Sequence, residues 1–245
     1  MKSSSANYQR NNLWLKIIFF FLTFLFAESV FSQSKNQNTS FEIKELLYSD
    51  DFESDLQNWI IEAKVSPRAM IELNDGNLSI DVNSGATIWF KNKLSGNLLI
   101  RCNRKVIMNN GANDRLSDLN MFWMASDPAN ENLFTRDGTF SKYHSLRLYY
   151  AGIGGNHNTT TRFRKYPGNG ERILYGDFTD KEHLLQPNRD YLIEILVDNG
   201  TTKVYVDHEE YFSFTENSPL TEGYFGFRTV QSHQEIDNFE VYRLK

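Results

Sequence analysis

Cysteine is nearly absent from this 245-residue sequence, which contains Cys102 alone. A single cysteine excludes an intrachain disulfide, and no Cys-x-x-Cys or His-x-x-x-His spacing offers a zinc site. Cys102 follows the apolar residues 98–100, so we expect a small core residue and not a nucleophile. The sequence therefore assigns no metal site through cysteine or histidine.

An excess of positive charge is also lacking. The whole chain has a net charge of −5, and residues 1–32 contribute +2, which leaves about −7 for the rest. General nucleic-acid-binding proteins are usually basic overall, so the composition disfavours that class of partner. An acidic protein with a local group of cations is suited instead to selective capture of a small or repeating anion.

Long apolar runs are confined to the beginning of the chain. Three cations precede the apolar segment 17–27, which is shorter than the roughly 20 residues that span a bilayer. Small or slim side chains follow at 30–32, as in a secretory signal peptide. We expect a signal peptide over 1–32, cleavage after Ser32, a polar leader over 33–45, and a periplasmic or secreted product free of the membrane. The alternative is a retained membrane anchor.

Helical patterns are scarce, and most of the remaining sequence alternates in the manner of β-strands. Segments 69–73 and 78–82 alternate apolar and polar residues on either side of an Asn-Asp-Gly-Asn turn. Similar short strands continue to the end of the chain, and the only helical candidates are 54–59 and 181–185. This pattern predicts an all-β sandwich or jelly roll, formed by a single domain over residues 46–245.

The segment from Tyr149 to Tyr166 combines aromatic hydroxyls, amides and cations around a glycine-rich turn. At the two-residue period of a strand, Arg162, Arg164 and Tyr166 share one face, and Phe163 points to the other. Two guanidiniums on one face suit a carboxylate or a sulfate, because each offers a planar fork of donors. The alternative is a hairpin with a solvated polar face.

The two ends of the predicted domain carry a resemblance. The opening segment 50–60 and the closing segment 223–243 are similar to the first and last strands of concanavalin-like jelly rolls. Between them, 118–128 and 156–164 resemble a narrower group of secreted Bacteroidota proteins, distantly YesU-like, that accompany enzymes degrading uronate-rich polysaccharides. Within this group the resemblance is closest in character to the oligosaccharide dehydratases of ulvan breakdown. It implies a concanavalin-like jelly-roll β-sandwich.

The resemblance also implies a reaction, β-elimination at C4 and C5 of glucuronate or iduronate in an anionic oligosaccharide. Neutralising the carboxylate at C5 acidifies the C5 proton, whose removal expels the substituent at C4. If that substituent is water the enzyme is a dehydratase, and if it is a sugar the enzyme is a lyase. We expect Arg162 and Arg164 to bind the carboxylate, with Asn158 as an uncharged donor.

Three residues are candidates for the catalytic base and acid: His144, Tyr149 and Tyr166. A histidine titrates near neutral pH, and a tyrosine beside two guanidiniums is expected to have a lowered pKa. Of the adjacent pair Tyr149 and Tyr150, we expect Tyr149 to face outward, because the preceding leucines share the alternation of Tyr150.

Five further residues complete the expected substrate-binding face: Arg147, Asn156, Trp123, Arg228 and His233. An indole presents an apolar face to the C–H groups of a sugar, although Trp123 has the core as its alternative. Arg228 alternates with core phenylalanines, and His233 falls in an expected turn between the last two strands.

No cofactor is expected, apart from a structural calcium ion for which Asp50, Asp51 and Asp237 are candidate ligands. The sequence Glu-x-Asp-x-x-Glu, which pairs carboxylates in jelly-roll glycosidases, is missing, and 118–124 stands at that place. Three functions are open: β-elimination on uronate oligosaccharides, a non-catalytic carbohydrate-binding domain, and a glycoside hydrolase with an atypical carboxylate pair.

Overall fold

Strands account for most of residues 41–245, the part of the chain that this computed structural model describes. The expected signal peptide and the leader up to residue 40 lie outside the described residues. None of the helices within 41–245 is long and apolar enough to cross a membrane.

The elements follow one another in chain order. The strands are β1 (Ile43–Asp50), β2 (Trp59–Ala63), β3 (Met70–Asn74), β4 (Asn77–Phe90), β5 (Leu94–Ser95), β6 (Leu98–Val106), β7 (Leu119–Ser126), β8 (Arg147–Gly154), β9 (Thr160–Pro167), β10 (Ile173–Phe178), β11 (Asp190–Asp198), β12 (Thr201–Val206), β13 (Glu209–Thr215) and β14 (Glu222–Leu244). The helical turns are η1 (Phe140–Tyr143), α2 (Gly155–Asn158) and η2 (Lys181–His183).

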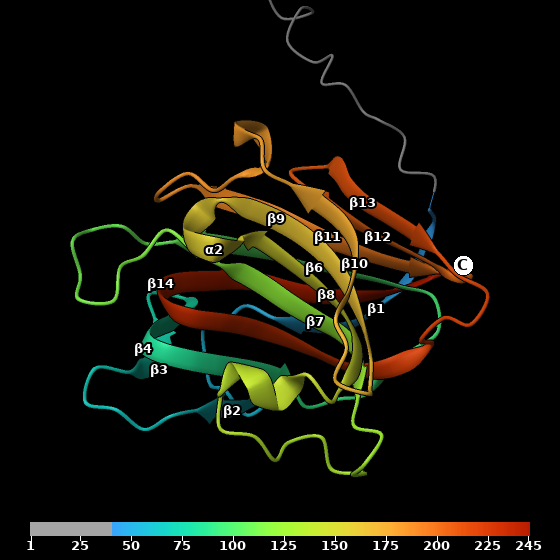
Figure 1. Cartoon of the computed structure of the whole chain (residues 1–245), viewed down its shortest axis with the longest axis horizontal. Coiled ribbons are helices and arrows are strands. Elements are labelled where there is room, and N and C mark those ends of the chain that lie inside the picture. Colours follow the sequence, from blue (N-terminus) through green and yellow to red (C-terminus); the bar gives the residue numbers. More distant parts are fainter. Residues whose placement is uncertain (1–40) are drawn as a thin grey trace, which may run out of the picture. The chain divides into compact units, whose positions relative to one another are not determined.

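The long strand β14 connects the two layers of a jelly-roll β-sandwich (Figure 1). Its first half pairs with β7 and β4, and its second half pairs with β6 and β1. The main strand order is β10-β9-β8-β7-β14-β6-β11-β12-β13. The two ends of this order fold over each other, since the rings of Phe163 on β9 and Phe212 on β13 have centroids 5.9 Å apart.

The main core lies between the layers and takes alternate side chains from each strand. Along β6, Cys102 and Val106 are buried, whereas Asn103 and Lys105 are half-buried. The prediction that Cys102 is a core residue is confirmed, and burial raises the pKa of its thiol to about 12. Trp123 is 0% exposed in the same core, so the expectation that it stacks on a sugar is wrong.

A second apolar cluster lies on the opposite face of β7, β8 and β9, partly covered by segment 127–146. Buried Glu62 on β2 connects this segment to the sheet. Its carboxylate accepts hydrogen bonds from Trp89 Nε1 on β4 (2.8 Å) and from the hydroxyl of Tyr143 in the segment (2.9 Å). Within the segment, Arg136 and Asp127 form an ion pair at 2.6 Å. Segment 127–146 is therefore held in place through Tyr143 and Arg136, and it leaves part of the outer face of β8 and β9 uncovered.

The hairpin predicted over 69–82 is confirmed as β3 and the first part of β4. The first strand begins at Ile43, slightly before the expected opening of the domain at residue 46. Residues 54–58 form a bend and a turn instead of a helix, and Trp59 begins β2. The last two predicted strands are one continuous strand, because no glycine or proline interrupts 227–244. His233 consequently lies within β14 and not in a turn.

Trp123→Ala is predicted to lower the free energy of unfolding by about 3–5 kcal/mol, because it leaves a cavity between the layers. It also removes the hydrogen bond from Trp123 Nε1 to Thr202 Oγ1 (3.0 Å). Urea denaturation checks the value. As a control, Val65→Ala at a fully exposed position is expected to change stability by less than about 0.5 kcal/mol. Equal midpoints for the two variants would contradict the core position of Trp123.

Candidate functional site

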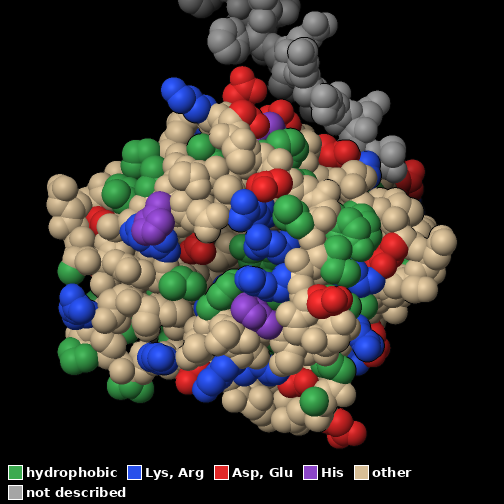
Figure 2. Space-filling view, in the orientation of Figure 1, with side chains coloured by type: hydrophobic (Ala, Val, Ile, Leu, Met, Phe, Trp, Pro, Cys, Tyr) green, Lys and Arg blue, Asp and Glu red, His purple; other side chains and the backbone are tan. Residues whose placement is uncertain are grey.

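A pocket of about 400 Å³ opens on the outer face, where β8 and β9 lie near the first half of β14. Figure 2 shows basic side chains gathered in a hollow of this face. The volume lies in the range of small-molecule binding sites. The lining residues are Arg115, Asp118, Phe140, Tyr150, Gly152, Gly155, Asn156, His157, Thr160, Arg162, Arg164, Arg172 and Val230.

Strand β9 supplies one side of the pocket through alternate residues. Arg162 and Arg164 line it, Tyr166 belongs to the outer cluster on the same face, and Phe163 packs in the main core. The alternation predicted for this strand is therefore confirmed.

Strand β8 places Tyr150 in the pocket and Tyr149 in the core, which reverses the sequence-based expectation. Tyr149 packs beside Phe163, its hydroxyl donates to Glu216, and it accepts from Leu220 N (3.1 Å). Tyr150 instead packs against Tyr166, with ring centroids 5.9 Å apart, and donates a hydrogen bond to Asn120 Oδ1 (2.7 Å). The expectation failed because Leu146 and Leu148, which precede Tyr150, do not face the main core; they belong to the second apolar cluster. Tyr149 is thus excluded as base or acid.

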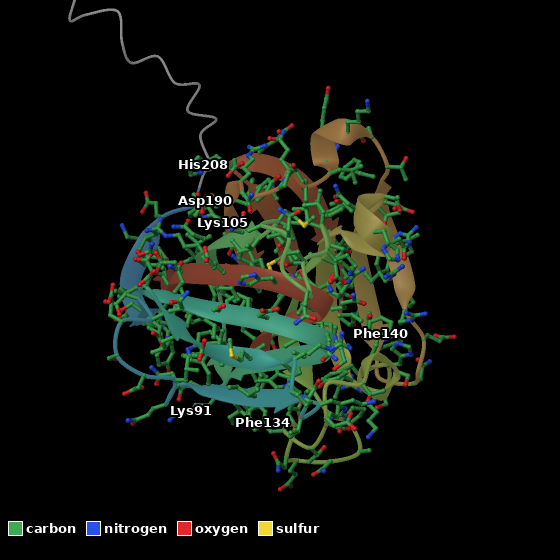
Figure 3. All side chains as sticks on the ribbon, turned by 90° about the vertical axis from the view of Figure 1, so that its left-hand side faces the viewer. Lys91, Lys105, Phe134, Phe140, Asp190 and His208 are labelled. Atoms are coloured by element: carbon green, nitrogen blue, oxygen red, sulfur yellow. The ribbon has the colours of Figure 1, made fainter. Side chains whose placement is uncertain are left out.

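Arginines at one end of the pocket have no carboxylate partner among the described residues. The guanidinium of Arg164 lies over the ring of Tyr150 (5.6 Å from Cζ to the centroid), and that of Arg172 lies over Phe140 (5.4 Å). Both stack on aromatic faces, so their donors are available to a ligand. Phe140 lies beside the yellow strands in Figure 3, with side-chain nitrogens near it.

Arg228 lies beneath this end and is 1% exposed. Its Nη1 donates to Thr87 Oγ1 (3.1 Å) and to the Gly138 carbonyl (2.7 Å), whereas buried Nε and Nη2 have no partner in the described part of the chain. Nε and Nη2 form the edge of a guanidinium that holds a carboxylate with two parallel hydrogen bonds. Burial lowers the pKa of Arg228, yet an arginine keeps its charge in proteins.

His144 and Tyr166 each present a buried polar atom without a hydrogen-bond partner in residues 41–245, namely Nε2 and the hydroxyl oxygen. The two rings meet edge to face at 6.3 Å, and His144 also meets Phe140 edge to face at 4.8 Å. Arg172 lies near the Tyr166 hydroxyl without a hydrogen bond of standard geometry. Buried polar groups are normally paired, so two such atoms beside a pocket mark a candidate site.

The pKa shifts at these two residues follow from burial and from the arginines. Burial lowers the pKa of His144, and the charges of Arg172, Arg228 and Arg164 lower it further. Burial raises the pKa of Tyr166, and the arginines only reduce that rise. The expectation that guanidiniums would lower the tyrosine pKa is therefore wrong, because desolvation of the phenolate outweighs their charge. At neutral pH, His144 is unprotonated and Tyr166 is protonated.

The other end of the pocket contains compensated charges. Arg162 Nε pairs with Asp177 Oδ1 (3.0 Å), and Arg115 Nη2 lies 3.7 Å from Asp118 Oδ1. Arg115 also donates to the carbonyls of Val230 and Gln231. We expected Arg162 and Arg164 to bind one carboxylate together. Arg162 is instead paired with Asp177, and of the two only Arg164 has no carboxylate partner in the described residues.

The turn between β8 and β9 separates two predicted ligands. Asn156 lines the pocket, as expected. Asn158 does not, because its amide exchanges hydrogen bonds with the backbone of Leu185 (2.9 and 2.8 Å). Gly154 and three following non-glycine residues have positive φ in this turn, and the Asn158 contacts hold that conformation.

Two further predicted ligands lie away from the pocket. Arg147 begins β8, two residues before Tyr149, so its side chain points to the same face as Tyr149 and not to the face of Tyr150. His233 Nδ1 lies 3.3 Å from Asp114 Oδ1 and is not among the lining residues.

Two important lining residues, Arg172 and Phe140, were missed from the sequence. Arg172 stands in the β9–β10 turn, where the hairpin register continues from Ile173 opposite Lys165. That register brings Arg172 toward Tyr166. If residues 160–178 had been predicted as a hairpin, the position of Arg172 beside Tyr166 would have followed. Phe140 comes from segment 127–146, whose path over the sheet has no local sequence signal.

Metal binding has little support in the described residues, which contain no group of three or more histidine, cysteine or acidic side chains able to hold an ion. Of the candidate calcium ligands, Asp50 accepts hydrogen bonds from Phe52 N, Asn58 Nδ2 and Trp59 Nε1. Asp237 accepts from Asn238, and Asp51 accepts from Glu53 N. These carboxylates serve as local hydrogen-bond acceptors.

Comparison with known proteins identifies the fold. A profile described as "Domain of unknown function (DUF6250)" matches residues 80–239. No curated protein matches the chain. Among solved structures, a protein of unknown function with galectin-like fold from Bacillus subtilis is similar, with a TM-score of 0.68, 19% identity, and coverage of 83% of this chain and 98% of that one.

Two other similar structures act on or bind carbohydrates by their descriptions. The carbohydrate-binding module CBM66 from Bacillus subtilis has a TM-score of 0.54 and 11% identity, covering 76% of this chain and 95% of that one. The endo-β-1,3-glucanase from Pyrococcus furiosus has a TM-score of 0.58 and 12% identity, covering 83% and 97%. At these identities the likeness shows the jelly-roll fold.

The environment of His144 predicts an imidazole that titrates below the ordinary value of about 6.5. Arg172→Gln removes one of the charges that lower this pKa, so the midpoint of His144 should rise. NMR titration of the imidazole signals checks both statements. Arg189→Gln is a matched control, because Arg189 pairs with Asp207 on another part of the surface. An unchanged midpoint in Arg172→Gln would show that the guanidinium does not act on His144.

Proposed function

Because the chain belongs to the DUF6250 family, whose description names no activity, we propose its function from the site: it processes uronate oligosaccharides by β-elimination. One observation carries this proposal. Three guanidiniums without carboxylate partners in the described residues surround a histidine and a tyrosine whose polar atoms are also unpartnered. An anionic group and a proton-transfer reaction would satisfy all of them together.

The carbohydrate part of the proposal draws support from the fold. Proteins with the same jelly roll include a carbohydrate-binding module and a glucanase, although fold alone does not give function. The anionic part draws support from the charges of Arg164, Arg172 and Arg228, which lie together in a chain of negative net charge. A uronate carboxylate meets both requirements.

The proposed reaction divides its roles among these side chains. Arg164 and Arg172 neutralise the carboxylate from the pocket side, while the free edge of Arg228 stabilises the enolate-like state from below. Neutral His144 removes the C5 proton through Nε2, and the protonated hydroxyl of Tyr166 donates its proton to the oxygen leaving C4. The electron pair of the C5–H bond forms the C4–C5 double bond as the C4–O bond breaks.

Both catalytic atoms are shielded in this structure. Phe140 lines the pocket and packs against His144, so its ring is the group that has to turn to admit a sugar. The leaving group is water in a dehydratase and a sugar in a lyase.

Glycoside hydrolysis by paired carboxylates is less well supported by the residues of the site than elimination is. A retaining glycosidase holds two carboxyl groups about 5–5.5 Å apart. Among the residues lining the pocket, only Asp118 has a carboxylate. Its oxygens already accept from Thr229 Oγ1 (3.0 Å) and Asn120 Nδ2 (2.7 Å). A non-catalytic binding domain would use the same arginines but would have no use for His144 and Tyr166.

The reaction is expected to take place outside the cytoplasm, since the cations and the short apolar run within residues 1–32 resemble a secretory signal peptide. N-terminal sequencing of the protein from its native host should find Gln33 as the first residue. Recovery of chains that retain Met1 in the membrane fraction would contradict export and cleavage.

The chemistry is tested with purified protein and oligomers of ulvan, pectin and glucuronan, by following the absorbance of the new conjugated double bond. His144→Ala and Tyr166→Phe are each expected to lower turnover by about 10²–10⁴-fold, as for loss of a general base or acid. Arg164→Gln should weaken substrate binding by about 1.5–3 kcal/mol. The rate should fall as the pH drops below the lowered pKa of His144, because the base becomes protonated.

Tyr149→Phe is the matched control, since Tyr149 lies in the core and should leave turnover close to that of the unchanged protein. If no oligomer yields an unsaturated product while binding is retained, elimination is wrong and the binding-domain function replaces it. Near-normal turnover in His144→Ala and Tyr166→Phe would reject the assigned roles.

A further inference from the structure

We propose that the pocket holds two neighbouring sugar units of different charge, and that Asp177 sets this preference. The uronate unit lies beside Arg164, and the unit beside Arg162 is uncharged. This inference rests on the proposed function and specifies its substrate class, an oligosaccharide in which each reacting uronate is linked to an uncharged sugar.

The register of β9 fixes the two positions. Arg162 and Arg164 point to the same face and lie about 7 Å apart along the strand, two residues at roughly 3.3 Å each. On the neighbouring strand β10, Leu174 stands opposite Arg164, whereas Asp177 stands opposite Arg162. The sequence of β10 therefore supplies a carboxylate to one arginine and an apolar side chain to the other.

The Arg162 end is close to electrically neutral. Arg162 pairs with Asp177 through Nε (3.0 Å), and Arg115 lies 3.7 Å from Asp118. His157, which also lines this end, adds charge only when it is protonated. Two cations are thus matched by two carboxylates before any ligand binds.

Neutral polar groups complete the Arg162 end. Asn156 and Thr160 offer an amide and a hydroxyl, which suit the hydroxyls of a sugar. Gly152 stands opposite Arg162, and a Cβ there would lie 2.0 Å from the Tyr150 hydroxyl oxygen and 2.5 Å from Asn120 Oδ1. The missing side chain keeps the floor flat at this position.

The Arg164 end has the opposite balance. Arg164 and Arg172 lie over aromatic rings, and buried Arg228 bonds only to a hydroxyl and a carbonyl. No carboxylate of residues 41–245 pairs with any of the three. An anionic group is therefore favoured here, whereas a second carboxylate at the Arg162 end would meet the charge of Asp177.

Binding of two tetrasaccharides tests the inference. One is a hyaluronan tetrasaccharide, in which glucuronate alternates with uncharged N-acetylglucosamine, and the other is a glucuronate tetramer. Calorimetry on the full chain with His144→Ala, which prevents turnover, should show tighter binding of the alternating one. Adding Asp177→Asn should improve binding of the glucuronate tetramer relative to the alternating one by about threefold to tenfold, the range of a partly screened charge interaction.

Asp180→Asn serves as the matched control. Asp180 lies just after β10 and contacts the ring of His183 (2.7 Å), but His183, unlike Arg162, is not among the residues lining the pocket. Its replacement should leave the affinity ratio unchanged. Two results would overturn the two-unit assignment but not the proposed function. One is an affinity ratio for the two tetrasaccharides that Asp177→Asn leaves unchanged, and the other is tighter binding of the glucuronate tetramer by the His144→Ala protein. Failure of every uronate oligosaccharide to bind would overturn the proposed function as well.

Discussion

The two-residue period of β8 and β9 is the constraint on which both the core and the site depend. On one face of these strands, Tyr149 and Phe163 close the main core between the layers. On the other face, Tyr150, Arg164 and Tyr166 form the pocket and its floor. A shift by a single residue would exchange the two sets, burying guanidiniums in the core and exposing aromatic rings. The apolar core therefore fixes the position of every functional side chain on these strands.

Desolvation then gives these side chains their chemical properties. Burial lowers the pKa of His144 and raises that of Tyr166, so the two shifts favour an unprotonated imidazole beside a protonated phenol. Burying Arg228 is unfavourable by itself, because an ion loses its hydration. Part of this cost is offset by hydrogen bonds from Nη1 and by the ring of Tyr143, whose centroid is 4.8 Å from Cζ. Glu62 holds that ring through its hydroxyl without approaching the guanidinium as an ion pair.

Alternation within strands could be predicted from the sequence, and relations between strands could not. The face shared by Arg162, Arg164 and Tyr166 follows from the period of one strand. The reversal of Tyr149 and Tyr150 came from the second apolar cluster, since the leucines of this cluster have the same local pattern as leucines of the main core. Likewise, the pairing of Arg162 with Asp177 depends on the register between β9 and β10, which includes an irregularity near Gly176.

The jelly roll is shared with carbohydrate-binding and carbohydrate-cleaving proteins, so the layers themselves do not distinguish these functions. The distinction depends on which side chains the outer face carries. A glycosidase needs paired carboxylates there, whereas Asp118, the one carboxylate that lines the pocket, accepts hydrogen bonds from Thr229 and Asn120 and lies 3.7 Å from Arg115. The positive charge of Arg164, Arg172 and Arg228, which no carboxylate of the described residues pairs with, would stabilise a negatively charged transition state and disfavour the oxocarbenium ion of glycoside hydrolysis. The proposed elimination therefore rests on the charges that surround the pocket and not on the fold.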